Sequence, residues 1–302
     1  MNVKFGRNYR LTIDPKDGGP QIIITLPFTT AFWVQRNNNS DLNRLDIDIY
    51  NLSEEHRNRI FQDRFNNGAV VLNGDQVGPR TIVFEAGYGT LYRIFEGDIF
   101  RASSARQGTD IITRIEARDG HYDVSATQVF QTSQSGQTLG DILKTLIGQF
   151  PNLKLGAVGN YSDSLSRPVV LNGNVYDLLK QYSENKVYID SGKVYVLRDA
   201  EAIEGEIATI NDATGILETP RRDDGFLSIT TLLEAGINMM QQVKIESTVQ
   251  KVYNGQYAVI GILHQGMISA AASGHCRSTF NLLAPNLFQQ GNQPAFVQVP
   301  SQ

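Results

Sequence analysis

Hydrophobic and polar residues alternate along most of the first third of the chain, as they do in β-strands with one buried face. The clearest case is RLDIDIY at 44–50, in which three aliphatic side chains alternate with two aspartates. The same reasoning predicts further strands at 9–13, 31–35, 69–72, 81–85, 91–103 and 109–117, with the last two joined as a hairpin through 105–108.

Two segments of this region depart from simple alternation. Residues 21–26 (QIIITL) are almost continuously apolar, which predicts a strand buried on both faces. Ser53 precedes two glutamates and predicts the N-cap of a helix. Ile60, Phe61 and Phe65 would form the apolar stripe of that helix, which should end at the Asn-Asn-Gly run that follows.

The middle of the chain changes to helical spacing. Thr138 is a predicted N-cap for a helix at 139–150, and Asn174 opens a second helix with apolar residues at i, i+3, i+4 and i+7. A hairpin at 187–197 follows, turning at Asp190-Ser191-Gly192. Two helices and a hairpin predict a small α/β lobe between two β-rich stretches.

After about residue 205 the pattern is that of strands again. Strands are predicted at 226–229, 242–246, 257–264 and 277–283, and 257–264 is apolar on both faces, so it should be central. Asn254-Gly255 between apolar flanks predicts a tight hairpin turn. The charged run 221–224 is interpreted as a solvated linker, and the polar tail 289–302 is expected to be mobile or ordered by a partner.

These stretches predict a β-rich α+β fold in three parts, at 1–118, 119–204 and 205–302. A chain of 302 residues and 33.5 kDa fits two or three domains. The first part could take a strand from beyond residue 204, which would make it discontinuous.

Charge and composition exclude several classes of function. The net charge is −4, with +1 in residues 1–118 (15 basic, 14 acidic) and −5 in the rest (12 basic, 17 acidic). Neither part has the basic stripe of a protein that grips nucleic acid. Asn and Gln together number 43, a density that suits hydrogen-bonded protein–protein surfaces.

Metal, disulfide and membrane roles are not expected either. Cys276 is the single cysteine, and the chain has four histidines, so a disulfide framework, a cysteine-built zinc site and a metal cofactor are not predicted. No apolar stretch approaches the length of a membrane helix, and the first ten residues do not resemble a signal peptide.

Candidate catalytic residues are few. His264, His275 and Cys276 lie close in sequence, but no orienting carboxylate accompanies them, so a nucleophilic site is not expected. Asp46 and Asp48 share a strand face, which an exposed alternating strand explains.

Two glycine-containing segments are interpreted as turns. Gly87-Tyr88-Gly89 is not followed by a helix, as a phosphate loop would be, and residues 14–18 lack the full calcium-loop pattern.

The third part carries a set of motif residues in a characteristic order. They are Gly225, Leu232, Leu233, Gly236, the strand 243–245, Gly255, Tyr257, His264 and Gly266. With the order of elements and Asn51-Leu52-Ser53, they resemble phage baseplate hub proteins: Mu-type tail hubs, the P2-type late control protein D family, the T4 hub and the N-terminal part of the type VI secretion spike. The family often has Asp after its His-Gly pair, whereas Met267 stands here.

The resemblance implies two β-barrel-like hub domains with the intervening lobe, and a homotrimer in which six such domains form a ring. That ring would match a hexameric tail tube on one side, and the lobes would meet a trimeric spike on the other. Other baseplate proteins would be neighbours, and DNA would pass as cargo through the channel. The protein would belong to the virion after assembly in the host cytoplasm, and the motif residues would be structural.

Two alternatives from other classes stay open. A tail-associated cell-wall hydrolase would need two positioned carboxylates, for which we find no signature. A tail-tip receptor- or glycan-binding module would favour aromatic side chains on loops, but Trp33 is the single tryptophan and is predicted in a strand. We expect a structural protein and not an enzyme.

Overall fold

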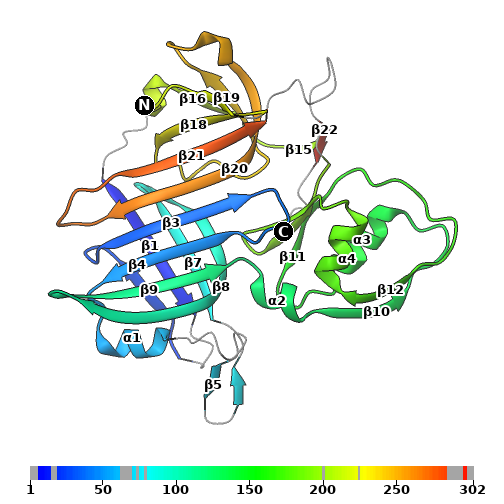
Figure 1. Cartoon of the computed structure of the whole chain (residues 1–302), viewed down its shortest axis with the longest axis horizontal. Helices are drawn as coiled ribbons and strands as arrows, with labels where there is room; N and C mark the ends of the chain where they lie inside the picture. Colours follow the sequence, from blue (N-terminus) through cyan, green and yellow to red (C-terminus); the bar gives the residue numbers. More distant parts are fainter. Residues whose placement is uncertain are drawn as a thin grey trace.

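The structure, a computed structural model, describes residues 6–14, 19–61, 70–72, 75–77, 80–198, 201–223, 225–283 and 295–297. Strands dominate it (Figure 1). The first part contains β1 (Arg7–Asp14), β2 (Ile22–Thr25), β3 (Thr30–Asn37), β4 (Arg44–Tyr50), β7 (Thr81–Tyr88), β8 (Thr90–Gln107), β9 (Asp110–Arg118), helix α1 (Glu54–Ile60) and the small pair β5 (Val70–Leu72) and β6 (Asp75–Val77).

The third part contains a second set of strands and two short 3-10 helices, at 212–214 and 251–253. Its strands are β16 (Ala208–Asn211), β17 (Arg221–Asp223), β18 (Phe226–Leu232), β19 (Gln242–Glu246), β20 (Gly255–Ile268) and β21 (Cys276–Leu283). With the first set they form one large sheet, whose path through the described residues is β17-β18-β21-β20-β3-β4-β9-β8-β7-β1-β2. The β-rich α+β prediction is therefore confirmed.

One strand pairing joins the first and third parts of the chain. β20 pairs antiparallel with β3, from Gly261 opposite Asn37 to Ile268 opposite Thr30. β20 also pairs with β21 along its other edge, so it is central, as predicted. The sheet is therefore continuous across the two parts, and the limits of the three predicted domains remain predictions.

The two sets of strands repeat the same order. The first runs β3-β4-β9-β8-β7-β1, and the second runs β17-β18-β21-β20-β19-β16. The irregularities repeat too, because the β8–β9 register shifts between Ile99 and Arg101 and the β20–β21 register shifts between Val259 and Gly261. One pairing differs: β1 is antiparallel to β7, whereas β16 is parallel to β19.

The two halves of the sheet bury separate hydrophobic cores, although Ile268 and Cys276 of the second half lie in the first core. The β4 side chains Leu45, Ile47 and Ile49 lie in the first core, as their alternation predicted, and Phe280 and Leu282 of β21 lie in the second. The opposite face of the first half carries ion pairs across neighbouring strands, including Arg114 with Asp48. Burial of one face thus fixes the register of the strands.

The lobe lies beside the sheet, on the right in Figure 1. It contains α2 (His121–Ala126), β10 (Gln128–Thr132), α3 (Leu139–Ile147), β11 (Lys154–Val158), β12 (Val170–Asn174), α4 (Val175–Tyr182), β13 (Val187–Asp190) and β14 (Lys193–Val196). Thr138 and Asn174 cap α3 and α4 as predicted, since the Thr138 side-chain oxygen accepts one backbone N–H of the first turn and that of Asn174 accepts two. α3 and α4 pack on the sheet β11-β14-β13 in a separate core.

Two predictions in the first part are wrong. Ile23 is exposed while Ile22 and Ile24 are buried, so the segment 21–26 has one buried face and not two. Among the described strands β2 pairs with β1 alone, at the edge of the sheet. α1 begins after Ser53 as predicted but ends at Ile60, and Phe61 is exposed. The predicted helix end after Phe65 lies outside the described residues.

Three predictions in the third part are also wrong. Asn254-Gly255 is not a two-residue turn, because the Asn254 side chain bonds the backbone of Ser247 and closes a longer loop. Residues 221–223 of the expected linker form the edge strand β17. The tail prediction fails at β22 (Ala295–Val297), which pairs in parallel with β15 (Glu201–Ile203) of the same chain. The rest of the predicted tail lies outside the described residues.

Candidate assembly site

The two side chains closest to a catalytic pattern are both inert by burial. The His264 imidazole is fully buried with its Nδ1 2.7 Å from Ser278 Oγ, and burial lowers its pKa to about 3. Burial also raises the pKa of the Cys276 thiol to about 11. A thiol held neutral and a histidine that resists protonation do not make an activated nucleophile.

The paired aspartates of β4 are held in ion pairs. Asp48 receives a bidentate pair of hydrogen bonds from Arg114, at 2.7 and 2.6 Å, and Asp46 lies 2.6 Å from Arg44. Within the described residues, no group of three or more histidine, cysteine or acidic side chains is placed to hold a metal ion.

Three of the motif residues converge on β21. The Leu233 N–H donates to the Cys276 carbonyl at 3.2 Å, and His264 contacts Ser278, whose Oγ also accepts the N–H of the residue after Leu233. Gly266 lies so close to β21 that an added Cβ would stand 2.5 Å from the Cys276 Cα. These contacts tie the segment after β18 to the β20–β21 hairpin.

The other motif residues lie apart from that cluster. Gly225 occupies the β17–β18 turn with φ of 106°, and the Leu232 N–H donates to the Gly215 carbonyl. Gly236 lies beside the ring of Tyr92, Gly255 pairs with Ile245, and the Tyr257 hydroxyl donates to the Tyr253 carbonyl at 2.8 Å. The structure places them as turns and packing positions, and their common role in the family remains a prediction.

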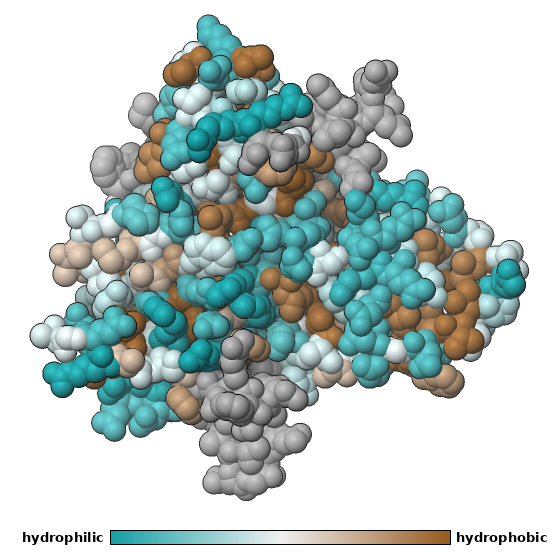
Figure 2. All heavy atoms as spheres, viewed as in Figure 1, coloured by the Kyte–Doolittle hydropathy of each residue, from teal (hydrophilic) through white to brown (hydrophobic). Residues whose placement is uncertain are grey.

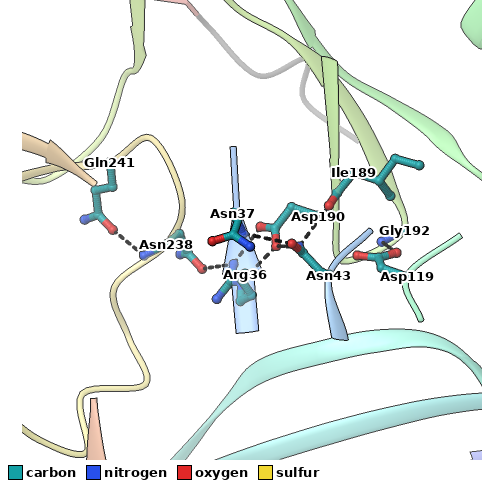
Figure 3. A network of polar contacts seen from close by, with 9 residues as sticks. All are labelled: Arg36, Asn37, Asn43, Asp119, Ile189, Asp190, Gly192, Asn238 and Gln241. Atoms are coloured by element: carbon teal, nitrogen blue, oxygen red, sulfur yellow. Dashed lines mark hydrogen bonds and ion pairs between the residues drawn. The ribbon is translucent and has the colours of Figure 1, made fainter. Parts of the chain in front are cut away.

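The site that sequence reasoning missed is a buried polar junction between all three parts of the chain (Figure 3). Arg36 of β3 donates to Asp190 of β13 through Nε at 2.8 Å and Nη2 at 2.6 Å. Arg36 Nη2 also lies 3.4 Å from Oδ1 of Asn238, in the segment after β18. The pair is almost fully buried, with the Arg36 side chain 2% exposed and Asp190 10%.

Two further side chains extend this junction. Asn43 donates to the Ile189 carbonyl at 2.9 Å and to Asp190 at 3.0 Å, and it accepts the Asn37 N–H at 2.9 Å. Asp119 accepts the Gly192 N–H at 3.1 Å, and burial raises the pKa of that carboxyl well above its usual range.

The junction's sequence signals were weak. Arg36 continues an apolar strand, and Asp190 opens a turn, which is an ordinary place for an aspartate. The pairing of an interior strand arginine with a turn aspartate 154 positions away depends on tertiary structure.

The outer face of the sheet forms an open groove of about 740 Å³ over β3, β4, β9 and β20. Trp33 lies in it, in a strand as predicted, with the Arg44 guanidinium carbon 5.6 Å from its ring centroid. Figure 2 shows this face as largely hydrophilic. Hydrophobic residues gather on the outer end of the lobe in Figure 2. Exposed hydrophobic side chains include Phe130 of β10 and Val252 of the loop between β19 and β20.

In the described ranges, no helix has the length and apolar character needed to cross a bilayer. No curated protein sequence matches this one, but several solved structures share its fold.

A 43 kDa tail protein of prophage MuSo2 from Shewanella oneidensis aligns with TM-score 0.62 and 11% identity over 96% of this chain and 100% of its own. A tail protein from Neisseria meningitidis aligns with TM-score 0.59 and 11% identity, over 93% of this chain and 98% of its own. A type VI secretion component of E. coli is described as structurally similar to the T4 tail proteins gp27 and gp5. It aligns with TM-score 0.54 and 11% identity, over 89% of this chain and 77% of its own.

These matches show that the chain has the fold of phage tail hub proteins. The sequence identifies the family: residues 10–267 match the baseplate hub gp41 family, and the chain belongs to it. It is therefore a bacteriophage baseplate protein of structural type and a component of the virion.

Proposed function

We propose that three copies of this protein form the hub ring that joins a hexameric tail tube to a trimeric spike. In this ring each chain supplies two related halves of the sheet, so three chains present six. The lobe occurs once per chain and would present three equivalent surfaces to the spike. The assembled ring would leave a channel through which DNA passes.

The observation that carries this proposal is the repeated strand order of the two halves, with the register shift at the same place in each. A hexameric partner needs six similar surfaces, and a trimer of duplicated halves supplies them. The buried junction around Arg36 supports the same view, because it fixes the lobe to the sheet as a single unit.

A channel for DNA requires a wall that does not bind phosphate strongly. On such a wall the arginines of the outer sheet face would meet this requirement, because Arg114 and Arg44 are each paired with an aspartate of β4. Paired guanidinium groups retain little net charge to hold a polyanion.

We infer that the protein is not an enzyme, and that its partners are its own copies, the tube, the spike and other baseplate proteins. Assembly would take place in the host cytoplasm. Release of fragments from purified peptidoglycan would instead support a cell-wall hydrolase. Clear hits in a glycan-binding screen, lost on replacing Trp33, would support a receptor-binding module.

The first test is the solution mass of the purified chain by light scattering after size-exclusion chromatography. We expect about 100 kDa, three times 33.5 kDa, and a ring in electron micrographs. A monomer that stays monomeric when the tube and spike proteins are added would overturn the trimeric hub.

A further inference from the structure

The repeat leaves one position filled in the second half and empty in the first. Along one edge of β20, residues 255–258 pair with β19, and residues 261–268 then pair with β3. Along the corresponding edge of β8, residues 90–98 pair with β7. Beyond them, no described strand pairs with this edge of residues 101–107, where β20 has β3.

The counterpart of β3 in the second half also has an unpaired edge. β17 and β3 are the first strands of equivalent hairpins, since β17 pairs with β18 as β3 pairs with β4. β3 uses its second edge to pair with β20, whereas β17 pairs with β18 alone among the described strands. The sheet therefore has two unpaired edges, on β8 and on β17. They correspond to the edges of β20 and β3 that pair with each other inside the chain.

We propose that β8 of one copy pairs antiparallel with β17 of the next copy, reproducing between chains the β20–β3 pairing within each chain. This inference rests on the trimer proposed above. Three internal and three intermolecular pairings would then alternate around the ring. Exposed edges tend to recruit strands, and a head-to-tail contact that closes on itself would pair both of these edges in every copy.

The repeat also fixes the register. The shared register shift makes Arg101 of β8 equivalent to Gly261 of β20, so Ala105 is equivalent to Gln265. On the other strand, Arg221 pairs with Ser228 and Trp33 pairs with Asp46. Ser228 and Asp46 stand in turn opposite equivalent residues of β21 and β9, so Arg221 is equivalent to Trp33.

Gln265 stands opposite Trp33 in the internal junction. The proposed junction therefore places Ala105 of one copy opposite Arg221 of the next, with their neighbours Ser104 and Arg222 also opposite. All four side chains are exposed in the isolated chain, as residues reserved for a partner strand would be.

Disulfide trapping tests this register. Directly opposed residues of antiparallel strands have Cβ atoms close enough for a disulfide. We would prepare Ala105→Cys and Arg221→Cys as separate, differently sized chains, both carrying Cys276→Ala, and mix them under mild oxidation. Arg10→Cys, at an exposed position of β1, replaces Ala105→Cys in the matched control.

The expected result is a disulfide-linked heterodimer, roughly tenfold more abundant than with the Arg10→Cys control, and no dimer from either chain alone. A chain carrying both Ala105→Cys and Arg221→Cys should give a covalent trimer in non-reducing gels.

Light scattering on the same samples separates the two proposals. A trimer that does not cross-link, or dimers of Ala105→Cys alone, would overturn this pairing and leave the hub proposal standing. Absence of both trimer and cross-link, with the tube and spike proteins present, would overturn both.

Discussion

The imidazole of His264 shows how one buried side chain can make stability depend on pH. It has no exposure to solvent, and Ser278 Oγ is its hydrogen-bond partner. Desolvation is the main cause of its low pKa, and the nearby charge of Arg36 lowers the pKa further. The folded protein therefore keeps this side chain neutral where the unfolded chain would protonate it.

This predicts a loss of stability on acidification. The folded pKa of about 3 lies below the ordinary value of 6.5, so stabilisation present above pH 6.5 is lost as the pH falls toward 3. Between pH 6.5 and 5 the loss should be about 2 kcal/mol, measured by urea unfolding. His264→Gln should remove that part of the pH dependence, and an unchanged slope in the variant would contradict the assignment.

Gly266 gives a second prediction, from space alone. Gly266→Ala would place a methyl group 2.5 Å from the Cys276 Cα and the His275 carbonyl oxygen, both of the backbone, and should cost more than about 2 kcal/mol in unfolding free energy. Gly255→Ala, in the same strand, meets its nearest atom at 3.6 Å and should cost under about 1 kcal/mol. Equal costs for the two variants would show that close approach is not the reason for the glycine at 266.

Among the elements, those that obey local rules could be predicted and those that depend on distant partners could not. Strict alternation of apolar and polar residues predicted β4, and the capping residues predicted where α3 and α4 begin. The Asn254-Gly255 signal failed because the asparagine side chain bonds Ser247 seven residues earlier. Arg221 sits in a charged run whose pairing with β18 is not visible in its composition.

The same limit applies to the candidate site. The motif residues in the third part could be picked out because they are glycines and leucines in a recognisable order. Arg36 could not be picked out from the sequence, because its burial depends on an ion pair with Asp190 of the lobe. Pairings between β3 and β20 or between β15 and β22 likewise join segments far apart in sequence, where no periodicity carries the information.

At the scale of the whole molecule, the Arg36–Asp190 pair joins the sheet to the lobe. Asp190→Asn would leave a buried guanidinium without its counter-charge and should cost about 3–5 kcal/mol. Arg36→Met combined with Asp190→Leu should cost clearly less, because no unpaired charge is left behind. Urea unfolding of both variants measures the difference, and a double variant as unstable as the single one would contradict the role of the charge pair.

The repeated halves have a genetic consequence. Positions that occupy the same place in the two halves are encoded by different codons, so a mutation at Trp33 leaves its counterpart Arg221 unchanged. A protein made of six identical subunits has no such freedom, since every mutation is copied six times. The two halves here already carry different residues at equivalent places, and each can be selected for its own neighbour without altering the other.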